Sequence, residues 1–168
     1  YYTEEIRRII KDNYGFDKLY AEGLSIKSAL DVNYQLYALS ALRSGIESYD
    51  RRHGWRGPIL NTKAKKNWQE KLKEKKIDYS LKWNFAEITS VKDSGIVFQI
   101  LNKKEQGTIT VNNLKWAINK TIYESFKIND VIFVHKKING TWELKQYPNV
   151  NGAIVAIDPF SGKVKALA

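Results

Sequence analysis

The sequence predicts a mainly β protein with flanking helices, α+β overall, in which a small antiparallel barrel is inserted between a helical N-terminal segment and a C-terminal β-hairpin. Three observations predict this class. Apolar residues recur at helical spacing in the N-terminal third. From about residue 83 to 147 the apolar period becomes two, and turn residues interrupt it at hairpin-like intervals. A run that is apolar at nearly every position follows at residues 151–157.

The N-terminal segment is predicted to contain two helices. The first begins at Thr3, where a capping residue precedes two glutamates, and ends at Gly15. A short strand is expected over residues 23–30, and Asp31 is expected to cap the second helix. The apolar stripe of that helix consists of Val32, Leu36, Leu39, Leu42, Ile46 and Tyr49. Two glycines and a proline in residues 50–58 should end it.

The positive charge is concentrated in one stretch. Net charge is +10, from 28 basic and 18 acidic residues, and residues 63–76 hold seven lysines and two glutamates. This stretch, with Trp68 and Leu72, is predicted to be a solvent-exposed helix. Basic chains are candidates for nucleic-acid binding, but 22 of the 28 basic residues are Lys and none after Arg56 is Arg. Arg is preferred for contacts to phosphate and guanine, so nucleic acid is not the favoured partner.

Five strands are predicted between residues 83 and 147. They are residues 83–91, 95–101, 108–111, 130–137 and the strand with Trp142 and Leu144. The dipeptide Asn139-Gly140 is a strong hairpin signal. A short helical turn should place Trp116 between the third and fourth strands. Five short antiparallel strands suggest a small barrel, for which the OB fold is one option.

The last segment is predicted to be an incomplete hairpin. The run 151–157 has the pattern of a strand buried on both faces, residues 158–162 form a turn, and a return strand starts at Lys163. We expect this hairpin to belong to a larger sheet outside the chain. Together with Tyr1 as the first residue and the absence of Met, this suggests a piece of a longer protein.

No catalytic, cofactor-binding or metal-binding residue is predicted. The sequence contains none of the glycine-rich nucleotide loops, no G-x-S-x-G elbow and no S-x-x-K. Its two histidines, His53 and His135, have no Cys or spaced His partner for zinc, and His135 is expected to be a half-buried strand residue. No apolar run approaches the roughly 20 residues of a membrane-spanning helix.

The aromatic residues of the barrel region allow two interpretations. They could form a base-stacking platform on an OB-like barrel, or they could fill its core and rim. The core is favoured because no Arg is interleaved with them. The residues concerned are Tyr79, Trp83, Trp116, Tyr123, Trp142 and Tyr147. The lysine-rich stretch is likewise interpreted as a solvated face, with a contact for anionic lipid, peptidoglycan or a protein as the alternative.

Two segments carry a resemblance to a known family. Residues 23–31 with Gln35, and the run Asp-Arg-Arg-His-Gly-Trp-Arg-Gly-Pro at 50–58, resemble the region before the transpeptidase domain of class A penicillin-binding proteins of the 1A type. Residues 148–167 resemble the first hairpin of the transpeptidase sheet in that family. Residues 113–117 also resemble the interior of its OB-like domain. The resemblance is close at both ends and loose in the middle.

The resemblance implies a bifunctional peptidoglycan synthase as the parent protein. Such a protein polymerises glycan and cross-links stem peptides through a penicillin-sensitive serine, at the periplasmic face of the bacterial inner membrane. The implied division is a flanking segment at 1–58, an OB-like domain with a lysine-rich helix at 59–147, and the first transpeptidase hairpin at 148–168. Neither catalytic set is expected in this chain, and the anchoring helix is expected outside it.

Our leading hypothesis is a non-catalytic linker or docking domain. Its partners would be its own glycosyltransferase and transpeptidase domains, and a regulatory protein or peptidoglycan. Arg51, Arg52 and Trp55 are predicted to anchor the domain junction. The alternatives are a nucleic-acid-binding OB module and a regulator-docking module.

Overall fold

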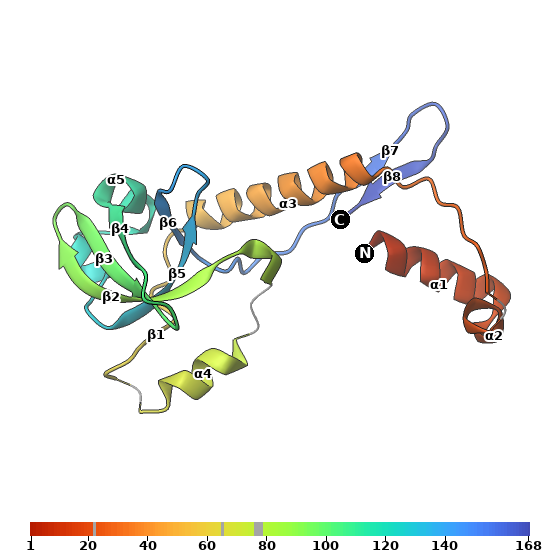
Figure 1. Cartoon of the computed structure of the whole chain (residues 1–168). Helices are drawn as coiled ribbons and strands as arrows, with labels where there is room; N and C mark the ends of the chain where they lie inside the picture. Colours follow the sequence, from red (N-terminus) through yellow and green to blue (C-terminus); the bar gives the residue numbers. More distant parts are fainter. Residues whose placement is uncertain (22, 65, 76–78) are drawn as a thin grey trace. The chain divides into compact units, whose positions relative to one another are not determined.

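The computed structural model describes residues 1–21, 23–64, 66–75 and 79–168 (Figure 1). It divides into two compact units. One consists of Tyr1–Ser48 with Asn149–Ala168, and the other is the continuous stretch Tyr49–Pro148. The second unit is therefore an insert in the sequence of the first, and the chain crosses its boundary twice.

In its described residues, the inserted unit contains six strands, joined by short helices. The strands are β1 (Leu60–Asn61), β2 (Asn84–Lys92), β3 (Gly95–Ile100), β4 (Gln106–Thr110), β5 (Asp130–Lys136) and β6 (Trp142–Lys145). The helices are α4 (Trp68–Glu74), α5 (Val111–Leu114) and α6 (Ile122–Ser125), with 3-10 turns η1 (Tyr79–Leu81) and η2 (Lys115–Ala117). The five strands predicted from the sequence are all present as β2 to β6.

The sheet is antiparallel throughout and runs in the order β1-β5-β2-β3-β4, with β6 also paired to β5 (Figure 1). Strand β5 is central. It pairs with β2 along one of its edges and with β1 and β6 along the other. The expectation of a five-stranded barrel is not confirmed. Among the described residues no ladder joins β4 to the far edge, so the sheet stays open.

Side chains fill the space between β4 and β6. At Gly107 of β4, an added Cβ would lie 2.8 Å from Trp142 Nε1 of β6 and 2.4 Å from the Phe98 ring. Strands β4 and β6 therefore approach one another through side chains rather than through backbone hydrogen bonds. The first strand, β1, was not predicted, because two residues are too few to show the alternation of apolar and polar residues that is typical of a strand.

Strand β5 is buried on both faces. Ile132 and Val134 face the main core, whereas Val131 packs with Leu60 and with Leu72 of α4 in a second cluster. The main core draws residues from every strand from β2 to β6 and from the short helices. Its buried members are Ala86, Ile88, Ile96, Phe98, Ile100, Ile109, Leu114, Ala117, Ile122, Phe126, Ile132, Val134, Trp142 and Leu144. Trp83 and Trp142 are 8% exposed, which supports the core interpretation for these two aromatics.

The lysine-rich stretch was predicted to be a solvated helix, and only residues 68–74 of its described part form a helix, α4. Trp68 and Leu72, four residues apart, lie on one side of this helix and pack against the sheet cluster. Residues 65 and 76 of the stretch lie outside the described part of the chain. His135 is half-buried on β5, as predicted.

The other unit contains α1 (Tyr2–Tyr14), α2 (Phe16–Tyr20), most of α3 (Val32–Arg52), β7 (Val155–Ile157) and β8 (Val164–Leu167). Helix α1 ends at Gly15, whose φ of 85° suits glycine. Asp31 caps α3 as predicted, because its Oδ1 accepts from the N–H groups of Asn33 and Tyr34 at 2.9 and 3.2 Å.

Two predictions for this unit are wrong. Helix α1 begins at Tyr2, with no side-chain cap from Thr3. Residues 23–30 form no strand, and Leu24 is 43% exposed there. The predicted hairpin is present as β7 and β8, and Val155 and Ile157 of β7 are 51% and 57% exposed in this chain. Burial of β7 by a larger sheet outside the chain stays a prediction.

Helix α3 packs its small residues against the hairpin of β7 and β8. Ala38 is buried with Ala166 and Ala168, next to Leu39 and Leu42. Gln35 pairs with the backbone of Leu167 in both directions: its Nε2 donates to the carbonyl at 2.9 Å and its Oε1 accepts from the N–H at 3.0 Å. The predicted stripe is only partly buried, because Val32 and Leu36 are exposed.

Candidate functional site

The candidate site is the place where the chain enters and leaves the inserted unit. The last turn of α3 ends at Arg52, where the N–H groups of His53 and Gly54 donate to the carbonyls of Asp50 and Arg51. Gly54 and Gly57 then have φ of 88° and 93°, which turn the chain away from the helix axis. After these bends, the backbone and side chain of Arg56 lie next to the segment that follows β6.

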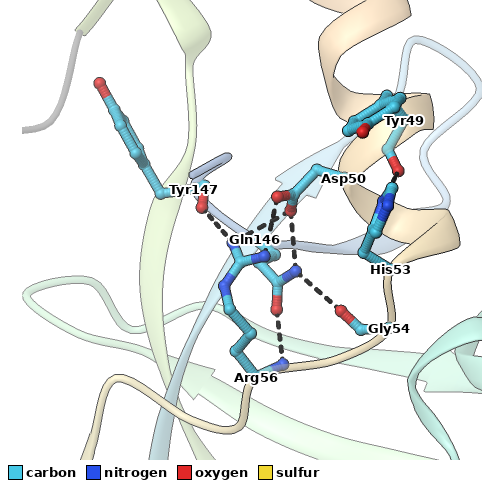
Figure 2. A network of polar contacts seen from close by, with 7 residues as sticks. All are labelled: Tyr49, Asp50, His53, Gly54, Arg56, Gln146 and Tyr147. Carbon is cyan, nitrogen blue, oxygen red and sulfur yellow. Dashed lines mark hydrogen bonds and ion pairs between the residues drawn. The ribbon is translucent and has the colours of Figure 1, made fainter. Parts of the chain in front are cut away.

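Asp50 and Arg56 form an ion pair at this point (Figure 2). The two terminal nitrogens of Arg56 donate to the two carboxylate oxygens of Asp50, at 2.7 and 3.0 Å. Asp50 is 3% exposed. A carboxylate this buried is costly unless it is paired and hydrogen-bonded, so the bidentate guanidinium contact offsets the loss of water.

Gln146 joins the two chain crossings to each other (Figure 2). Its Nε2 donates to Asp50 Oδ2 at 2.8 Å and to the Gly54 carbonyl at 3.1 Å, and its Oε1 accepts from the Arg56 N–H at 2.8 Å. Arg56 also donates to the Tyr147 carbonyl. The side-chain amide of Gln146, on the leaving segment, thus both donates to and accepts from residues of the entering segment.

Arg51 and Trp55, two of the three residues predicted from the sequence, contact this junction. Arg51 donates to the Leu144 carbonyl at 3.2 Å, and its guanidinium lies 5.2 Å from the Trp116 ring. Trp55 is half-buried, with its ring centroid 5.7 Å from those of Trp116 and Phe126. Its buried Nε1 finds no hydrogen-bond acceptor among the described residues.

Arg52, the third predicted residue, lies further from this network. Its guanidinium is 5.6 Å from the Tyr49 ring, and the residue is exposed. His53 approaches the same segment, with Nδ1 2.9 Å from the Tyr49 carbonyl oxygen (Figure 2). The structure therefore brings Arg51 and Trp55 against the sheet and places Arg52 on the helix surface.

Glu143 of β6 lies within ion-pair distance of three cationic side chains beside the junction. Its carboxylate lies 2.9 Å from Lys145 Nζ, 3.2 Å from Lys137 Nζ and 3.8 Å from Arg51. Burial acts to raise the pKa of Glu143, but the hydrogen bonds and charges of Lys145 and Lys137 outweigh it. The pKa of this carboxyl therefore lies below its ordinary value of 4.5.

We call Asp50, Arg56 and Gln146 the clasp. Their polar side-chain groups are paired with each other and with nearby backbone, and none is an activated nucleophile with an adjacent base. Within the described residues no three His, Cys, Asp or Glu side chains gather as metal ligands. No described helix is long and apolar enough to cross a membrane.

Sequence reasoning missed Asp50, Arg56 and Gln146, which form the centre of the site. The first two lie in the distinctive run at 50–58, so that run did carry the signal. Gln146 is an isolated residue 90 positions after Arg56 and 96 after Asp50, and nothing in its sequence neighbourhood indicates its partners.

An open antiparallel sheet inserted between two flanking segments, with its two crossings joined by a network of polar contacts, defines an inserted β domain. Comparison with known proteins specifies the family. The model of the penicillin-binding protein OB-like domain matches residues 55–150. The chain therefore belongs to that family. Its relatives assign it to the 1A type, which confirms the resemblance found in the sequence.

Two relatives and one solved structure illustrate the match. Penicillin-binding protein 1A of Rickettsia typhi is 34% identical over 99% of this chain and 21% of its own length. The Haemophilus influenzae protein of the same name is 26% identical over 99% and 20%. The crystal structure of the Haemophilus protein superimposes with a TM-score of 0.72, at 25% identity, over 99% of this chain and 25% of that one. The chain thus spans about one fifth of the length of these relatives.

Proposed function

We propose that the inserted unit is the linker domain of a peptidoglycan synthase, and that it positions a glycosyltransferase domain relative to a penicillin-sensitive transpeptidase domain. The observation that carries this proposal is the clasp of Asp50, Arg56 and Gln146. It joins the entering and leaving segments within a few residues of the boundary of the unit. A rigid connection at both crossings is what a spacer needs, because two independently flexible crossings would let the flanking domains drift.

The division of the chain into 1–58, 59–147 and 148–168 is part of this proposal. So are the location at the periplasmic face of the inner membrane, an anchoring helix elsewhere in the parent, and docking of a regulatory protein or of the glycan strand. We keep Arg51, Arg52 and Trp55 as junction residues in the proposal. The support is greatest for Trp55 and Arg51, which contact the core and β6.

The proposal is tested in the full-length parent protein. The double variant Arg56→Met with Gln146→Ala should leave glycan polymerisation unchanged and lower peptide cross-linking about threefold or more. Displacements of about 1 Å at a reacting centre can reduce rates by up to roughly 100-fold. Labelling with a fluorescent penicillin should remain normal, which shows that the transpeptidase site itself is intact.

The matched control is Lys92→Met with Gln106→Ala, which likewise removes one cation and one amide, at exposed positions of β2 and β4. Cross-linking should be unaffected by the control. If the junction variant cross-links as well as the control, although its junction is measurably destabilised, the positioning role is wrong.

A further inference from the structure

The lysine-rich stretch is the largest concentration of charge that the clasp does not use. Its described lysines are Lys63, Lys66, Lys71, Lys73 and Lys75, and we call them the lysine surface. All five are exposed, and none forms an ion pair in the part of the chain that the structure describes. With Glu70 and Glu74 as the acidic residues nearby, five lysines against two glutamates leave a local charge of +3.

The lysine surface is held on a folded support. Trp68 and Leu72 turn inward from α4 and pack with Leu60 and Val131 of the sheet. The N–H of Lys63 donates to Asn61 Oδ1 at 3.1 Å, which ties the start of the stretch to β1. The charges are therefore presented by an anchored element rather than by a loose tail.

The composition of this surface limits the partners it suits. A membrane-binding helix buries an apolar face in the lipid, but both large apolar residues of α4 are already packed against the sheet. Binding to single-stranded nucleic acid uses exposed aromatic rings and Arg, and the lysine surface has neither. Glu70 and Glu74 would also repel a densely charged phosphate array. A polymer with carboxylates spaced along it fits better.

We propose that the lysine surface holds the peptidoglycan strand through the carboxylates of its stem peptides. This inference rests on the proposed function, because it takes the polymer that a peptidoglycan synthase produces as the partner. The contact is electrostatic and dispersed, since Lys provides hydrated point charges instead of a bidentate fork. It should weaken as ionic strength rises past the physiological range, where exposed charges are screened beyond about 8 Å.

The test uses the 168-residue chain and insoluble peptidoglycan sacculi in a sedimentation assay. The triple variant Lys71→Gln, Lys73→Gln and Lys75→Gln should bind about tenfold more weakly than the unmodified chain, at the same melting temperature. The control changes three exposed lysines of the same unit, Lys92, Lys104 and Lys120, to Gln and should stay within about twofold. Sacculi whose carboxyl groups have been amidated should lose binding, whereas N-acetylated sacculi should keep it.

Three results would overturn the proposal. They are undiminished sedimentation of the triple variant, an equal loss in the control variant, and tighter binding to vesicles rich in phosphatidylglycerol or to a single-stranded oligonucleotide than to sacculi. Because the junction is unchanged in the triple variant, failure here leaves the positioning role intact. If the cross-linking test of the junction variant fails, sacculus binding by the lysine surface can still be measured independently.

Discussion

Arg56 donates through both terminal nitrogens to the two carboxylate oxygens of Asp50, only six positions earlier in the chain. The carboxylate is almost fully buried, and Gln146 completes its hydrogen bonding from the far end of the domain. The pair and Gln146 therefore link the turn after α3 to the segment that leaves the inserted unit.

We expect the Asp50–Arg56 pair to be a main stabilising contact of the junction. Arg56→Met should lower the free energy of unfolding of the inserted unit by about 2 kcal/mol, because it leaves a buried carboxylate without its cation. Arg56→Lys should recover less than half, since an ammonium cannot bind both oxygens in a fork. A double-mutant cycle with Asp50→Asn, measured by urea unfolding, should give a coupling energy of about 1–2 kcal/mol. Additive effects would mean that the pair contributes no coupling.

The stability of the inserted unit should depend on both the charge and the size of the side chain at position 146. Gln146→Ala removes three hydrogen bonds and should cost about 1–2 kcal/mol in the free energy of unfolding. Gln146→Glu keeps the size but places a second carboxylate next to Asp50, so at neutral pH it should cost more than the alanine variant. Lowering the pH to about 5 should narrow that difference. If Gln146→Glu is as stable as the wild type at pH 7, the amide does not donate to Asp50.

The lowered pKa of Glu143 makes its contribution depend on pH. A carboxyl whose folded pKa is below the unfolded value of 4.5 adds stability that is fully present above that value. This contribution disappears as the pH falls through the folded pKa. Glu143→Gln should therefore destabilise by about 1 kcal/mol at pH 7 and have a smaller effect below pH 4, as measured by thermal melts. An equal loss at pH 7 and below pH 4 would show that the charge of Glu143 contributes nothing to stability.

Two glycines should respond in opposite ways to alanine. Gly107→Ala places a Cβ 2.4 Å from the Phe98 ring and 2.8 Å from Trp142 Nε1, and both rings are held in the core. We expect a loss of about 1–3 kcal/mol from overpacking. A Cβ at Gly45 of α3 meets nothing within 4 Å. Gly45→Ala should therefore stabilise by about 0.5–1 kcal/mol through helix propensity, and the comparison needs only two melting curves.

Trp55 should tolerate loss of its N–H but not loss of its ring. Trp55→Ala should cost about 3 kcal/mol, because the ring packs between Trp116 and Phe126. Trp55→Phe should cost about 1 kcal/mol or less, since it also removes a buried donor that has no acceptor among the described residues. A phenylalanine variant as unstable as the alanine variant would show that the indole N–H has a partner, such as a buried water.

The sequence by itself determined the local structure of this chain and its family. Period-two patterning and turn dipeptides located all five strands from β2 to β6, because alternation and turn chemistry are short-range properties. Asp31 was recognisable as a cap for the same reason. The run at 50–58 carried the resemblance, which the match to the OB-like domain confirms.

Only the tertiary structure decided how these parts meet. Whether the strands close into a barrel depends on which edges pair. Strands β1 and β6 share one edge of β5, while β4 pairs with β3 and, among the described residues, with no strand beyond it. The exposure of β7 depends on its neighbours, which no pattern within the strand reveals. The clasp depends on Gln146 reaching Asp50 across 96 positions. A long-range hydrogen bond leaves no period or spacing in the sequence, because it is set by how the sheet folds the chain back on itself.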